Sequence, residues 1–204
     1  MKRWLHVLGW LGVTLITHQT QAQVPSKALQ LITAKADHWS SFRASLQCWE
    51  RDHPKSPWKP VYPNAKPVLL GKKGLAWGTA DFKIPESSIP KKIEKDWKAP
   101  AGIFALGKLH GYAKQGPSGS TWPYHQVGEW DAWIDDPTLP EYNRHIVVNP
   151  ANPPSWFPKQ RMRLGDFAYT WLLEIQHNTH PPVPGLGSAI FFHVRRGPDR
   201  PSAG

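Results

Sequence analysis

Short apolar runs alternate with clusters of proline, glycine and polar residues along most of the chain. Within residues 41–50, Phe42, Ala44, Leu46 and Cys48 alternate with polar or charged residues. This period of two is typical of a strand with one buried face. It places Cys48 on the apolar face, so we expect this residue to pack in the core rather than to act as a catalytic thiol.

The other apolar runs predict further strands. Residues 28–33 are expected to pair with 41–50 as a hairpin. Four more segments have strand character: 66–71, 100–113, 145–150 and 170–178. Residues 189–194 predict a terminal strand, and the stretch that opens at Arg161 predicts a short helix. With 22 prolines and 16 glycines spread between these runs, the sequence predicts a mainly β fold.

The first 22 residues have the features of a secretory signal. Lys2 and Arg3 precede an apolar run from Trp4 to Thr17, and small residues at Thr20 and Ala22 indicate cleavage after Ala22. The run is shorter than the ~20 residues that span a bilayer. We therefore expect a signal peptide at 1–22, a single domain at 23–204, a periplasmic or secreted location, and no stable membrane span after cleavage.

The formal net charge is +10, and removal of the signal lowers it to +8. The positive charge of a basic exported protein favours binding to an anionic surface of the cell envelope, although the same charge also maintains solubility. No signature of a nucleic-acid-binding module is present, so no nucleic-acid partner is expected. Cys48 is the only cysteine, which excludes an internal disulfide.

Ten histidines raise the question of a metal site. The closest pair, His177 and His180, brackets a turn and lacks the glutamate of an HExxH motif, so we expect neither a metal nor another cofactor. Asp135 and Asp136 lie in a turn sequence without a second carboxylate partner that would indicate a glycosidase. His193 ends the terminal strand just before a loop. Such a histidine can activate a nucleophile, or it can simply close the core.

Five segments resemble, in order, the L,D-transpeptidase catalytic-domain (YkuD-like) family: 71–78, 96–113, 133–143, 177–194 and 201–204. The resemblance runs from about Leu29 to the last residue. The chain is most similar to the branch of the family whose members consist of a secretory signal and this domain alone. It implies a β-sandwich or barrel with one or two short helices.

The catalytic block of that family contains a histidine, a short loop, then Ser or Thr, any residue, Gly and Cys. His193, Ser202 and Gly204 match the first three fixed positions, and the cysteine would be residue 205. The resemblance implies cysteine-dependent acyl transfer on peptidoglycan stem peptides, as a transpeptidase or a carboxypeptidase. Residues 1–204 lack the nucleophile, so we expect the domain to be incomplete at its C-terminus and this chain to be inactive. Either the sequence is a shorter product of a longer reading frame, or the gene has lost its end.

The resemblance also suggests substrate-binding residues. Motif position indicates Tyr112, Trp122 and Asn178 as cleft residues, with a structural role as the alternative. Arg195, Arg196 and Arg200, in the catalytic loop, could bind substrate carboxylates or could be solvated charges. We expect a monomer. The alternatives to the enzyme are a non-catalytic wall-binding remnant and a basic β-domain that binds anionic envelope polymers.

Overall fold

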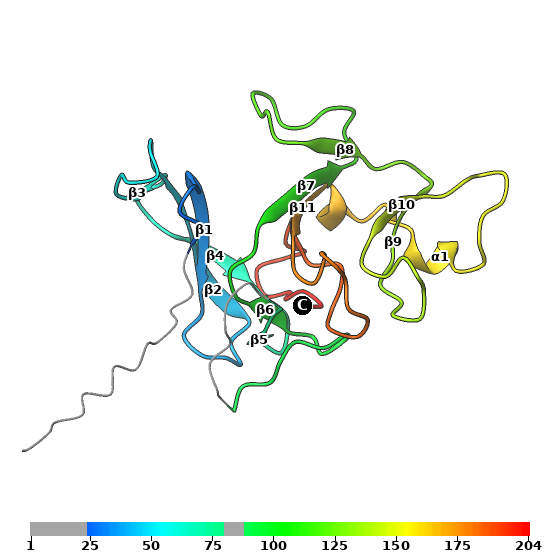
Figure 1. Cartoon of the computed structure of the whole chain (residues 1–204), viewed down its shortest axis with the longest axis horizontal. Helices are drawn as coiled ribbons and strands as arrows, with labels where there is room; N and C mark the ends of the chain where they lie inside the picture. The colour runs from blue at the N-terminus through cyan, green and yellow to red at the C-terminus, as the bar shows by residue number, and fades with distance from the viewer. Residues whose placement is uncertain (1–23, 80–87) are drawn as a thin grey trace, which may run out of the picture.

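The computed structural model describes residues 24–79 and 88–204, and the predicted signal peptide lies outside them. Within these residues, short strands form four sheets joined by long loops, with very little helix (Figure 1). The prediction of a mainly β fold is therefore confirmed. No helix in the described part of the chain has the length and apolar character needed to cross a membrane.

The first sheet is built around β2 and contains β1 (Gln30–Lys35), β2 (Arg43–Glu50), β3 (Lys59–Pro60) and β4 (Lys66–Leu69). Strand β2 pairs antiparallel with each of the others. The predicted hairpin is confirmed, because Gln30 lies opposite Glu50 and Lys35 lies opposite Ser45. Cys48 is only half-buried, opposite Ile32. Figure 1 shows this sheet in blue and cyan at one side of the molecule.

The second sheet has the order β12-β11-β7-β8 and carries much of the core. Its strands are β7 (Leu106–Gly111), β8 (Tyr124–Gln126), β11 (Trp171–Ile175) and β12 (Phe191–His193). Strand β11 is antiparallel to β7 and β12, whereas β8 runs parallel to β7. Leu172 on β11 packs with Val127, Trp133 and Met162, and Phe191 covers this cluster. The strands predicted within 170–178 and 189–194 are thus both present.

Two smaller sheets complete the fold. One pairs β5 (Leu75–Trp77) with β6 (Ala99–Ala101) in parallel, and the other pairs β9 (Asp131–Trp133) with β10 (His145–Val147) antiparallel. A second apolar cluster is formed by Ala132 of β9 together with Ile134, Val148 and Phe157.

The helix predicted to open at Arg161 is displaced in the structure. The α-helix α1 (Phe157–Gln160) ends just before Arg161, and a 3-10 helix, η1, covers Phe167–Tyr169. Pro158 suits the first turn of α1, where a missing N–H costs no hydrogen bond. Arg161 has extended backbone angles and bridges Ala132 of β9. Pairing with the sheet therefore stops the helix at the residue where the sequence pattern predicted its start.

Candidate functional site

His193 lies at the end of β12, opposite Leu172 of β11. Its Nδ1 is 2.9 Å from the Val194 carbonyl oxygen, and its ring lies at 87° to the Tyr169 ring with centroids 6.0 Å apart. A carbonyl oxygen can only accept a hydrogen bond, so Nδ1 carries the proton in the neutral ring. The lone pair is then on Nε2, which is the arrangement that a general base requires.

The loop after His193 crosses to the first sheet. The Ser202 N–H donates to the Leu70 carbonyl at 3.0 Å, and the Lys72 N–H donates to the Ser202 carbonyl at 3.0 Å. The Ser202 hydroxyl oxygen also accepts from the Gly204 N–H at 3.2 Å. Ser202 therefore fixes the shape of the terminal turn through both its backbone and its side chain.

Two glycines permit a close backbone approach at the end of this loop. Gly204 has φ +114°, and a Cβ there would lie 2.5 Å from the Lys98 carbonyl oxygen. A Cβ on Gly71 would lie 2.9 Å from the Gly204 Cα. Both distances are shorter than any normal contact, so side chains at these positions would separate the segments. The C-terminal residues are thereby held next to β6, as Figure 1 shows.

The three loop arginines differ in their surroundings. Arg196 donates to the Asp166 carboxylate through both Nε, at 2.9 Å, and a terminal nitrogen, and it lies over the Tyr169 ring. Hydrogen bonds from Arg196 lower the pKa of Asp166 below its usual value. Arg196 therefore ties the loop to η1, whereas Arg195 and Arg200 are exposed.

The expected cleft residues are engaged in the fold to different degrees. The Asn178 amide donates to the Val183 and Gly187 carbonyls and accepts from the Val183 N–H, so its side chain is committed to its own loop. Tyr112 packs against the core cluster of the second sheet. Trp122 donates to the Gly107 carbonyl at 2.8 Å but remains 38% exposed. Of these three, Trp122 presents an aromatic surface to solvent.

Asn143 is a buried residue that the sequence reasoning missed. Its Oδ1 accepts from the Trp133 indole at 3.1 Å and from the Ala189 N–H at 3.0 Å. Its Nδ2 donates to the carbonyls of His177, at 3.1 Å, and Asn178, at 2.7 Å. The only sequence signal is its place at the end of the segment 133–143. Asn143 joins that segment directly to 177–194.

A second buried network supports the same region. The Tyr142 hydroxyl and the Ser188 hydroxyl both donate to the Glu94 carboxylate, the latter at 2.8 Å. Burial, together with the hydrogen bond to Glu94, raises the pKa of Tyr142. Nearby, the Lys92 ammonium pairs with Asp96 at 2.6 Å, and both side chains are almost fully buried. These contacts hold the residues before β6 against the loop that leads into β12.

A separate cluster of histidines lies where β8, β9 and β10 meet. Nε2 of His125 and Nε2 of His145 are each 2.5 Å from Oδ1 of Asp131. Burial would raise the pKa of Asp131, but hydrogen bonds from His145, the Gly128 N–H and His125 lower it overall. Metal-ligand motifs depend on close spacing in the sequence, of which His177 and His180 are the tightest histidine pair, so they do not reveal a cluster assembled from three separate strands.

His110 packs against this cluster from β7. Its ring centroid lies 5.1 Å from that of His145 and 5.6 Å from that of His125. It is 1% exposed, and its Nδ1 has no hydrogen-bond partner among the described residues. Burial, with the nearby His145, lowers its pKa to about 3, so the ring is neutral at physiological pH.

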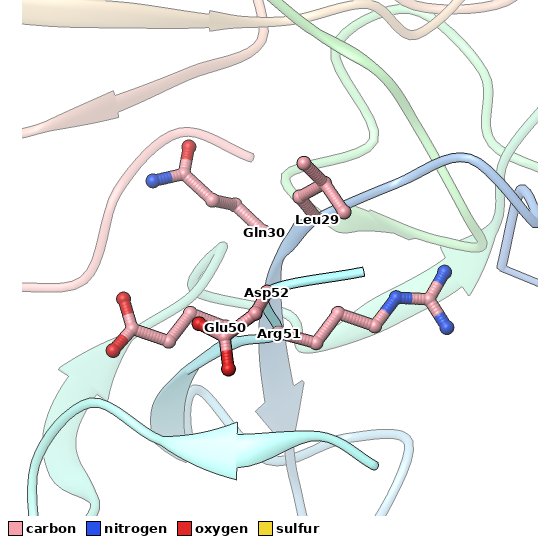
Figure 2. A pocket seen from close by; sticks show the side chains of 5 residues that line it. All are labelled: Leu29, Gln30, Glu50, Arg51 and Asp52. Atoms are coloured by element: carbon pink, nitrogen blue, oxygen red, sulfur yellow. The ribbon is translucent and has the colours of Figure 1, made fainter. Parts of the chain in front are cut away.

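An open depression on the first sheet is lined by Leu29, Gln30, Glu50, Arg51 and Asp52 (Figure 2). Figure 2 shows the Glu50 and Arg51 side chains extending to opposite sides. The Arg51 guanidinium also donates to the carbonyls of Ala28 and Ser26. Because its charged groups diverge, the depression is a poorer candidate site than the loop after β12.

No family model, curated protein or solved structure matches the chain. The resemblance to L,D-transpeptidases therefore rests on the residues of the five segments themselves.

Proposed function

We propose that this chain is a domain of the L,D-transpeptidase type, which acts on peptidoglycan stem peptides by cysteine-dependent acyl transfer. We further propose that its sheets correspond to the β-sandwich or barrel of that family and that the protein is exported. One observation supports the proposal most strongly: the five separate segments that resemble the family contact one another in the fold.

Hydrogen bonds, and one ring contact between His110 of the second segment and Trp133 of the third, join these segments. Gly71 and Ser202 bridge the first segment to the last. The Lys73 N–H donates to the Trp97 carbonyl at 2.9 Å, and β5 pairs with β6, which joins the first segment to the second. Asn143 joins the third to the fourth. These contacts bring together segments that are far apart in the sequence, as a shared active site would require.

In the proposed reaction, Nε2 of His193 takes the proton of a thiol that follows Gly204, and the thiolate attacks the carbonyl carbon before a terminal D-amino acid. The tetrahedral oxyanion would be stabilised by backbone N–H groups, each typically worth ~3 kcal/mol of the barrier. The imidazolium returns its proton to the departing amine, which leaves a thioester. An amine from a second stem peptide, or water, then attacks the thioester and regenerates the thiol.

The decisive experiment compares the chain 1–204 with a form extended by a cysteine and the residues that follow it in the coding sequence. Each is incubated with a stem tetrapeptide, and the mass of the intact protein is then measured by mass spectrometry. We expect a thioester adduct on the extended form, loss of that adduct in His193→Ala, and its retention in His180→Ala, which alters an exposed histidine on another loop. We expect none on 1–204.

Three results would overturn the proposal: an adduct on Cys48 of the chain 1–204, an extended form that forms none, or an adduct that is indifferent to His193→Ala. Peptidoglycan binding without any adduct in the extended form would instead favour the non-catalytic wall-binding protein.

A further inference from the structure

We propose that His125, Asp131 and His145 form a binding site for a divalent transition-metal ion of the zinc type. This site is independent of the acyl-transfer proposal, which needs no metal.

The strand pairings bring these side chains together. His125 on β8 is the register partner of His110 on β7, so the two rings lie on one face of the second sheet. On the small sheet, Asp131 lies opposite Val147 and His145 lies opposite Trp133, which places Asp131 and His145 as diagonal neighbours on one face. The convergence therefore depends on two sheets and not on a flexible loop.

The donor atoms suit a transition metal. Two imidazole nitrogens and one carboxylate oxygen, all within 4.8 Å of one another, are the ligand set of many open zinc sites. Zinc–ligand bonds of 2.0–2.1 Å in tetrahedral geometry place such atoms about 3.3 Å apart. The two nitrogens, each 2.5 Å from Oδ1, would need to move outward by less than an ångström on that basis.

The site is also open on one side and braced on the other. The side chains of His125 and His145 are 28% and 18% exposed, which allows an ion and a water ligand to enter from solvent. Asp131 is 6% exposed, and its second oxygen accepts from the Gly128 N–H at 2.7 Å. A hydrogen bond of this kind orients a ligating carboxylate.

Buried His110 supplies an independent observation. Within residues 24–79 and 88–204 its Nδ1 has no hydrogen-bond partner, although its ring packs against the imidazoles of His125 and His145. A buried polar nitrogen without a partner is unusual in a native protein, and this one belongs to a ring packed directly against both proposed histidine ligands. Lys108, exposed on β7, opposes the binding of a cation, but solvent and salt screen its charge.

Untagged full-length protein, stripped with a chelator, would be titrated with Zn²⁺ and with Co²⁺. We expect one ion per chain, a tetrahedral Co²⁺ absorption band, and a rise in the melting temperature on adding Zn²⁺. The double variant His125→Gln/His145→Gln should weaken binding by at least ~100-fold, because loss of a residue that only orients a ligand already costs ~10–100-fold. His38→Ala, which alters an exposed histidine between β1 and β2, should leave binding unchanged. Far-UV circular dichroism of the metal-free variants shows whether they fold.

Asp131→Asn removes the charge of the carboxylate ligand. If this variant or the double variant does not fold, the single variant His125→Gln, which alters the more exposed ligand, is used for the test. Stoichiometric binding that survives all folded variants would overturn the proposal. So would the absence of binding at millimolar Zn²⁺, which would leave Asp131 as a carboxylate that simply accepts hydrogen bonds from two imidazoles.

Discussion

Asn143 shows how one side chain can hold several segments together. It adopts the left-handed conformation, with φ +55°, which asparagine tolerates better than most residues. In that conformation its amide satisfies two donors and two acceptors from three other parts of the chain. No other residue of similar size offers both a carbonyl and an NH₂ group, so few replacements can preserve all four bonds.

Asn143→Ala should lower the free energy of unfolding by about 3 kcal/mol or more, because each buried partner left unpaired costs ~1–3 kcal/mol. Urea denaturation followed by tryptophan fluorescence would measure the change. Asn152→Ala, in an exposed turn, is the matched control and should alter stability very little. Equal stability of Asn143→Ala and the wild type would contradict the assigned role.

At the scale of elements, the loop from β12 to the C-terminus connects the two larger sheets. It begins at His193, is tied to η1 through Arg196, and pairs with the chain beyond β4 through Ser202. Exposed Asp199 also contacts Arg43 of β2, although exposed ion pairs typically add less than ~1 kcal/mol. Backbone pairing and close packing at glycine therefore matter more than charge for the position of this loop.

Gly71→Ala should destabilise the protein by ~1–3 kcal/mol and release the terminal loop, because the new Cβ meets backbone atoms of Trp97, Ala99 and Gly204. Urea denaturation and the rate of proteolysis near Arg200 would report the two effects. Gly197→Ala, in the same loop, meets only the flexible Arg200 side chain and should be nearly neutral. Identical behaviour of the two variants would contradict the close packing.

Elements with a clear local pattern were predictable, and contacts between elements were not. The alternation in residues 41–50 identified β2, and the apolar run ending at His193 identified β12. The cluster of His125, Asp131 and His145 could not be found in this way. Its strands are only three residues long, too short to show a period, and the ligands meet through pairings that no local signal encodes.

For Asn143 the missing information was its burial, since an asparagine near a turn is ordinarily a solvent-exposed turn former. For the helix expected at Arg161, the local pattern was overruled by pairing with β9. The resemblance names segments of the chain and not the side chains that join them, so it could not point to Asn143 either.

At the scale of the whole molecule, the excess of positive charge predicts association with anionic polymers. The full sequence carries 25 Lys and Arg against 15 Asp and Glu. Isolated sacculi that bear anionic groups should bind the protein several-fold less strongly as salt rises from ~50 to ~300 mM, because the screening length shortens from more than ~10 Å to below ~8 Å. Co-sedimentation would measure the fraction of protein bound to the sacculi at each salt concentration.

An uncharged polysaccharide particle provides the control and should retain little protein at any salt concentration. Binding to sacculi that does not change with salt would contradict a charge-driven association. If His193→Ala leaves salt-sensitive binding intact and the stem peptide has no measurable affinity, the basic β-domain that binds envelope polymers becomes the better description.

The contact between Arg43 and Asp199 joins residues 156 positions apart, and the Gly71–Ser202 bridge also joins residues that are distant in the sequence. Closing so large a loop costs chain entropy before its contacts offset the loss. Proteins dominated by such distant pairings fold slowly compared with those built from local ones. Refolding should therefore produce the β1–β2 hairpin well before the C-terminal residues reach β6, so His193 and the residues around Ser202 would acquire their native arrangement among the last parts of the chain.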